Sequence, residues 1–313
     1  FLNMLQLIGW TSIMIYDAML ALQALAPLSP MIWTIAIGAL VILWLFIGLH
    51  NTGYVQAIVS LLLLSLTFYM GMHMIAQWPS ESNLVSDGSM SFIAALELSI
   101  AMPLSWLPLI SDYTRESKHP FTASLTSATI YTVTSIVMYT LGLSAAIFGG
   151  GDSIITIMMN AGLGLAGLLV IIFSTVTTTF MDAYSAGVSS TTIYNSASSK
   201  GVAVIVTIVG TIAAILYPMD DITDFLYLIG SVFAPMIAIL LADYFINRQQ
   251  VQTLSAYLVR GLIWAVSVGL YHYMLHTEST IGATLPAFTM AFIVTAIIGF
   301  ISKTAHTSAE IKQ

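Results

Sequence analysis

Cysteine is absent from this chain of 313 residues, and charged residues are scarce. Without cysteine, the chain can form neither disulfide bonds nor thiolate sites. Only 7% of its residues are charged, 58% are hydrophobic, and the mean hydropathy is +0.95. A soluble domain of this length needs a charged surface, and this chain has too few charges to provide one. The composition therefore excludes a soluble protein and indicates an integral membrane protein.

Basic patches and catalytic motifs are lacking as well. The chain has 7 Lys and Arg residues against 14 Asp and Glu residues, and no basic patch that would bind nucleic acid. It has no Walker loop, no HExxH motif and no Ser-His-Asp arrangement, so we expect neither an ATP-driven pump nor an enzyme. The 6 histidines are scattered near the ends of the apolar segments without metal-ligand spacing.

Apolar runs of about twenty residues, long enough to cross a hydrocarbon layer of ~30 Å, recur along the chain. Apolar and polar residues do not alternate in these runs, so they predict helices and not the strands of a barrel. We predict one all-α transmembrane domain over residues 1–313 in the lipid bilayer, with a short surface helix at 149–162. The expected spans are 1–25, 31–49, 54–77, 92–110, 121–148, 163–187, 201–217, 222–246, 258–275 and 283–302.

The few basic residues predict the orientation. With these spans, every base falls on one side of the membrane, and the loops of the other side are acidic. Such segregation is typical of cytoplasmic basic loops, so we expect a multi-pass protein of the cell (inner) membrane with both ends of this chain cytoplasmic. The chain begins FLNMLQLIGW, without Met and inside an apolar run, and we expect that an N-terminal part is missing.

Two spans carry irregular sequence. In 92–110, Pro103 lies mid-span with Ser105 and Trp106 after it. Proline removes a backbone donor, and a broken helix in lipid persists where it lines a cavity inside the protein. A break at Pro103 would therefore mark a transport site, and a plain proline kink is the alternative.

The second irregular stretch is 174–187, STVTTTFMDAYSAG, where hydroxyl groups precede Asp182. On a helix, Ser174, Thr178 and Asp182 form one row, and Thr175, Thr179 and Asp182 form the next. A lone carboxylate in the membrane costs ~3 kcal/mol or more, so Asp182 needs a partner. That partner is a hydroxyl network, a proton, a metal cation or an amine-bearing substrate. Each threonine could instead bond back to its own helix.

Three further positions are weaker candidates. Asp17, in the outer half of the first span, could be a structural hydrogen bonder, and Glu97 is either a proton site or a partner for the broken helix. Gln6 and Trp10 lie one helical turn apart. Together they could hydrogen-bond and stack on a flat heterocycle, or they could be an interfacial aromatic with a polar neighbour.

Three segments resemble the nucleobase–cation symporter-1 family: LNMLQLIGWTSIMI (2–15), SWLPLISDYTRESKHP (105–120) and STVTTTFMDAYSAGVSS (174–190). Within the family, they are most similar to bacterial transporters of hydroxymethylpyrimidine, a thiamine precursor. The resemblance implies a LeuT-type fold of twelve spans, of which the first ten form two inverted repeats. Ten spans here imply that the first two family helices are absent, so that the Pro103 span is family helix six and the Asp182 span is family helix eight.

The resemblance also implies two sites. Ser174, through its carbonyl, and Thr177 and Thr178 match positions that bind Na⁺ as the coupling ion. For the heterocycle, the matching positions are Trp10, Ser105 and Thr179, with Pro103 where relatives place an aromatic residue that Trp106 could replace.

We therefore predict a secondary active transporter that imports a pyrimidine-type heterocycle, hydroxymethylpyrimidine, by Na⁺ symport with alternating access. Asp182 would accept hydrogen bonds from the amino group and a protonated ring nitrogen of the 4-aminopyrimidine. The alternatives are a proton-coupled purine, cytosine or allantoin permease of the same family, with Asp182 or Glu97 carrying H⁺, a channel, and a non-transporting membrane receptor. No cofactor beyond the coupling ion is expected.

Overall fold

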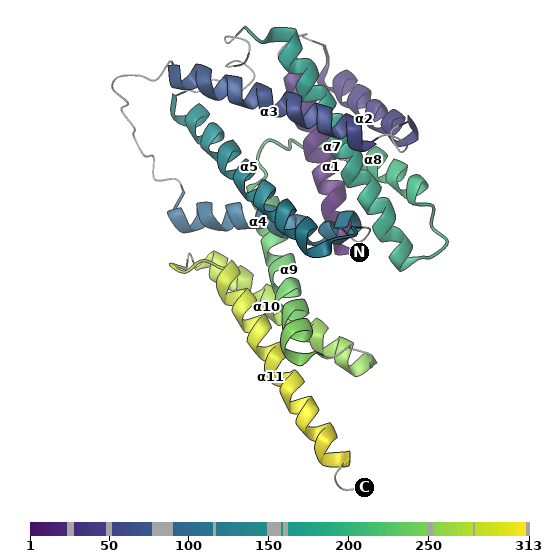
Figure 1. The fold of residues 1–313 in the computed structure, drawn as a ribbon, viewed down its shortest axis with the longest axis vertical. Coiled ribbons are helices and arrows are strands. Elements are labelled where there is room, and N and C mark those ends of the chain that lie inside the picture. The colour runs from purple at the N-terminus through teal and green to yellow at the C-terminus, as the bar shows by residue number, and fades with distance from the viewer. Residues whose placement is uncertain are drawn as a thin grey trace. The chain divides into compact units, whose positions relative to one another are not determined.

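The ten predicted spans are all helices in the computed structural model, and each is long and apolar enough to cross a membrane. The structure describes residues 1–23, 28–47, 52–76, 90–114, 117–148, 158, 162–248, 253–277 and 279–310. The helices are α1 (Leu2–Gln23), α2 (Pro30–Ile47), α3 (Thr52–Ala76), α4 (Phe92–Thr114), α5 (Pro120–Phe148), α7 (Gly164–Ile193), α8 (Ser199–Leu216), α9 (Thr223–Leu241), the π-helical turn η2 (Ala242–Asn247), α10 (Leu254–His276) and α11 (Thr284–Glu310) (Figure 1).

The helices group into two compact units. Unit 1 consists of Phe1–Ser86 and Ile110–Asp221, and unit 2 of Asp87–Leu109 and Ile222–Gln313. Unit 1 therefore contains α1 to α3, α5, α7 and α8, and unit 2 contains most of α4 with α9 to α11. The single domain predicted over 1–313 remains a prediction, and each unit is described by itself.

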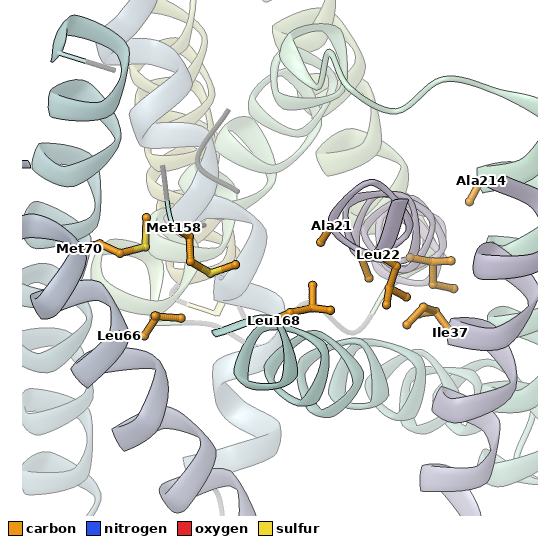
Figure 2. Close-up of a cluster of buried hydrophobic side chains, with 10 residues drawn as sticks. Ala21, Leu22, Ile37, Leu66, Met70, Met158, Leu168 and Ala214 are labelled. Carbon is orange, nitrogen blue, oxygen red and sulfur yellow. The ribbon is translucent and has the colours of Figure 1, made fainter. Parts of the chain in front are cut away.

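In unit 1, α1 is the central helix and packs against α2, α7 and α8. Small residues allow this close packing, because a side chain in their place would collide with a neighbouring helix. A Cβ atom at Gly210 of α8 would lie 2.7 Å from a methyl carbon of Thr11. The apolar core around these helices is drawn in Figure 2, and it includes Leu22, Ile37, Leu66, Met70, Met158, Leu168 and Ala214.

A hydrogen bond fixes the register of α1 and α7. The Asn3 amide, at the start of α1, donates to the hydroxyl of Ser189, near the end of α7, over 2.8 Å. The two helices are thus antiparallel, so a step of about 1.5 Å per residue along α1 is matched by an equal step backward along α7. Trp10 lies seven residues after Asn3 on α1, and Asp182 lies seven residues before Ser189 on α7. The two residues are therefore expected at a similar depth.

In unit 2, polar side chains tie the end of α9 to α10 and α11. Asp243 in η2 makes a bidentate ion pair with Arg260 of α10, with a closest distance of 2.9 Å. The buried amide of Asn247 donates to Asp243 over 2.8 Å and to the carbonyl of Thr295 in α11 over 3.1 Å. The indole of Trp264 donates to the Val232 carbonyl of α9 over 3.0 Å. These contacts hold the three helices together as one unit.

Of the two alternatives at Pro103, the structure has the plain proline and not a break. α4 continues as one helix through both Pro103 and Pro108. The hydroxyl of Ser105 donates to the carbonyl of Met102 within the same helix over 2.6 Å. α7 is likewise an unbroken helix and reaches Ile193, beyond the predicted end of the span at residue 187. The surface helix predicted at 149–162 lies, apart from residues 158 and 162, outside the described residues.

We expect Gly187→Ala to destabilise unit 1. A Cβ atom at Gly187 of α7 would lie 2.1 Å from the Ser199 carbonyl oxygen, a backbone atom at the start of α8 that cannot rotate away. Overpacking of this kind costs about 1–3 kcal/mol, so thermal unfolding of the purified protein in detergent should begin several degrees lower. Gly142→Ala in α5 is the control, because a Cβ atom there meets nothing within 4 Å. Equal unfolding temperatures for the two variants would contradict the α7–α8 packing.

The α1–α7 register can be tested by cross-linking. We expect the double variant Asn3→Cys/Ser189→Cys to form a disulfide under mild oxidation, because these side chains already touch. The chain has no cysteine of its own, so the loss of free thiols, measured by a maleimide-polyethylene glycol gel shift, reports only this pair. In the control Asn3→Cys/Thr178→Cys the second thiol lies about 16 Å further along α7, and both thiols should stay reactive. Protection of the control pair would show that the register is wrong.

Candidate functional site

One face of α7 is lined by oxygen atoms over four helical turns. At about 100° per residue, the side chains of this face fall within an arc of about 100°. They are Ser174, Thr175, Thr178, Asp182, Ser185 and Ser189. The sequence predicted the rows that contain Asp182, and the unbroken α7 extends the same stripe to Ser189, which meets α1.

Asp182 is buried in this stripe without a partner. Its exposed fraction is 7%, and within the part of the chain that the structure describes, no residue donates a hydrogen bond to its carboxylate or pairs with its charge. One turn away, the Thr179 side chain is 0% exposed, and its hydroxyl also has no hydrogen-bond partner among the described residues. A buried polar group without a partner costs free energy, and no described residue offsets that cost for Asp182 or for the Thr179 hydroxyl.

The facing side of α1 is polar and aromatic. Asn3, Gln6, Trp10, Met14 and Asp17 lie within an arc of about 80°. The Gln6 side chain is buried, and its amide donates to the Asn3 side chain over 2.8 Å. Because Asn3 in turn donates to Ser189, the amide of Gln6 is oriented by a chain of hydrogen bonds that ends on α7. The sequence did not indicate Asn3, since its role depends on a partner 186 residues away.

The predicted sodium ligands of α7 differ in their hydrogen bonds. The hydroxyl of Thr177 donates to the carbonyls of Phe173 at 2.9 Å and Ser174 at 3.1 Å, so Thr177 bonds back to its own helix. The hydroxyl of Thr178, which is half-buried, makes no hydrogen bond to a described residue. Among the described residues, no group of three or more His, Cys, Asp or Glu residues could hold a metal ion. Any cation here would therefore bind to hydroxyl and carbonyl oxygens with Asp182 as the nearest charge on α7, a donor set that suits a hard cation.

The three predicted substrate residues of α4 lie in unit 2 and do not share one face. Ser105 is buried on a face with Glu97, and Pro103 lies about 160° around the helix from Ser105 and is exposed. Trp106 lies between them and is half-buried. Pro103 and Ser105 thus point to different sides of α4.

The hydrogen bonds of Glu97 go to the start of α11 and not to its own helix α4, and its role as a proton site stays a prediction. One carboxylate oxygen of Glu97 accepts hydrogen bonds from the backbone N–H groups of Ala283, at 2.5 Å, and Thr284, at 2.6 Å. These groups lie at the N-terminus of α11, where a negative charge is favourable. No local pattern in the sequence could have revealed this pairing, because it joins residues 186 positions apart.

Comparisons with known proteins agree with this architecture. The family model for permeases of cytosine/purines, uracil, thiamine and allantoin matches residues 2–311. A solved structure, described as Mhp1, a nucleobase-cation-symport-1 family transporter in a closed conformation with bromovinylhydantoin bound, superposes with a TM-score of 0.70 and 17% identity. The match covers 97% of this chain and 75% of Mhp1, and at this identity it supports the fold alone.

No match was found among the curated proteins. The superposition on Mhp1 confirms the predicted all-α, LeuT-type transporter fold. The predicted family rests on the family model, which covers nearly the whole chain, and a family of permeases agrees with the expectation of a transporter and not an enzyme. The chain therefore belongs to the family of permeases for cytosine and purines, uracil, thiamine and allantoin.

Proposed function

We propose that this protein imports an aminopyrimidine, hydroxymethylpyrimidine, by Na⁺ symport with alternating access. One observation carries the proposal: Asp182 is a buried carboxylate without a partner among the described residues, on a helix face lined by hydroxyl groups. A 4-aminopyrimidine brings an amino group and, once protonated, a ring N–H. Both can donate to a carboxylate, and hydrogen bonds to a charged group contribute about 1.5–3 kcal/mol each.

Trp10 supports the same proposal. Trp10 lies seven residues after Asn3 and Asp182 seven residues before Ser189, so the Asn3–Ser189 bond supports a similar depth for the two, and Trp10 shares a helix face with Gln6. An indole ring stacks on a flat heterocycle, and an amide held by Asn3 supplies a directed polar contact. Thr179, whose hydroxyl has no partner among the described residues, is a further donor for the ligand.

The coupling ion is proposed to bind α7 one turn before Asp182. Thr178 supplies a hydroxyl without a hydrogen bond to a described residue, and Ser174 supplies a backbone carbonyl. Opposite charges one helical turn, about 6 Å, apart attract each other by roughly 3 kcal/mol inside a protein. A cation beside Asp182 would keep the carboxylate ionised, and substrate and ion would then tighten each other's binding reciprocally.

The remaining assignments follow from the resemblance. Pro103, Ser105 and Trp106 are proposed to contribute to the heterocycle site from family helix six. The segregation of basic residues supports an inner-membrane protein with both ends of this chain in the cytoplasm.

We expect Asp182→Asn to reduce uptake of hydroxymethylpyrimidine into proteoliposomes. Loss of the charged acceptor should raise the half-saturating substrate concentration by roughly 10–100-fold, the equivalent of one charged hydrogen bond. Asp220→Asn, in an exposed turn before α9, makes the same change of acid to amide away from α7 and should leave uptake unchanged. Uptake by Asp182→Asn that matches the wild type would make the aspartate structural. Binding without uptake in the wild type would favour a membrane receptor.

Sodium coupling is tested at Thr178. We expect Thr178→Val, which removes one proposed oxygen ligand at nearly constant volume, to raise the Na⁺ concentration for half-maximal uptake at least several-fold. Thr140→Val in α5 is the matched control, because the Thr140 hydroxyl donates to its own helix at the carbonyl of Ile136 over 2.7 Å and the residue is exposed. Uptake that follows the pH gradient and ignores Na⁺ in the wild type would replace Na⁺ symport with the proton-coupled alternative.

A further inference from the structure

Unit 2 contains a cavity of about 440 Å³ that includes none of the residues of the α7 stripe. It lies where α4, α9 and α11 begin and where α10 ends. In the proposed topology, all four of these ends are on the outer side of the membrane. A volume of this size falls in the range of roughly 300–1,000 Å³ that small-molecule sites occupy, and it is far larger than a bare ion requires.

Glu97 is the charged residue that lines this cavity, and only half of its carboxylate is used by the protein. The Oε1 atom accepts both hydrogen bonds from the N-terminus of α11. Within the described residues, nothing donates to Oε2, although the side chain is only 7% exposed. The cavity therefore presents a carboxylate oxygen that the fold orients but to which no described residue donates.

The position of this carboxylate is fixed from both sides. Gly282 has a φ of +77°, and a Cβ atom there would lie 2.7 Å from Oε1, so only glycine lets the turn approach so closely. Tyr271 of α10 is buried in an apolar cluster with Ala283 and Ala287, which anchors the start of α11 to α10. The fold therefore holds the Glu97 carboxylate in position without a ligand.

The other lining residues indicate the class of ligand. Tyr227, Thr223 and Ser279 bring hydroxyl groups, and Met90 and Met274 bring flexible apolar surface. Among the lining residues that the structure describes, none is Lys or Arg. Methionine adapts to flat aromatic groups. We propose that this cavity is a second, outer binding site for a small N–H-donating heterocycle of the aminopyrimidine class, which donates to Glu97 Oε2. The identity of the ligand and the outward position rest on the proposed function.

The acidic outer ends of unit 2 favour such a ligand. Asp224 lies in the first turn of α9, one residue after the cavity residue Thr223. A cleft lined by negative charge raises the local concentration of protonated amines. An outer site of this kind would hold substrate near the entrance of a transporter whose central site is still closed to the outside.

The test is the number of labelled hydroxymethylpyrimidine molecules that the purified protein binds in Na⁺ buffer at the concentration that just fills the wild-type sites, where a weakened site stays largely empty. We expect two per chain in the wild type, close to one in Glu97→Gln, close to one in Asp182→Asn, and close to none in the double variant. Glutamine keeps an oxygen for the N–H groups of Ala283 and Thr284, so Glu97→Gln preserves the α11 contact while it replaces Oε2 by a donor. Its unfolding temperature is measured alongside as the check on folding.

A second variant fills the cavity without touching Glu97. Ala94→Phe places a ring in the space that Ala94 lines, and it should also bind one molecule per chain. Two bound molecules in both Glu97→Gln and Ala94→Phe would overturn the outer site, as would a single molecule in the wild type. If Asp182→Asn still binds two while both outer variants bind one, the outer site stands and the proposed role of Asp182 fails.

Discussion

Polar groups between the two faces of a membrane must be satisfied inside the protein, because the hydrocarbon offers no hydrogen bonds. Several buried hydroxyl groups among the described residues meet that constraint within their own helix. Thr11 donates to the Leu7 carbonyl, Thr207 to that of Ala203, and Ser267 to that of Ile263, all at 2.7–2.9 Å. A polar group that is buried without such a bond is therefore the place to look for a binding site.

The two intramembrane acids show how the same residue type takes different roles. Glu97 receives two backbone N–H groups of α11, so part of its charge is satisfied by the fold. Asp182 receives no hydrogen bond from the described residues, and neither does the nearby hydroxyl of Thr179. Glu97 thus organises the start of α11, whereas the fold provides no described partner for Asp182. In the proposed function, that leaves Asp182 available to a ligand.

Local pattern predicted the helices well and the contacts between them poorly. Ten apolar runs gave ten helices, since span length and composition are properties of a segment alone. The stripe around Asp182 was also visible, because helical spacing decides which residues share a face. At Pro103 the sequence left a break and a plain kink open, and the structure has a continuous helix. Whether a proline interrupts a helix depends on the packing around it, which a single sequence does not encode. The bonds from Asn3 to Ser189 and from Ala283 to Glu97 join residues 186 positions apart, and no single-sequence pattern encodes them.

An acid without a partner also explains how binding and conformational change are linked. Burial of an ionised Asp182 costs most free energy when no ligand is bound. A closed state with an empty site is therefore less favourable than a closed state with a ligand. A cation beside the carboxylate lowers that cost, and a donor-rich heterocycle lowers it further. Each ligand therefore binds more tightly when the other is present, and linkage requires that the two affinities rise by the same factor. If the proposed ion coupling holds, the scarcity of charge in the membrane is what makes it possible, because a Lys or Arg placed beside Asp182 would satisfy the acid permanently and remove the coupling.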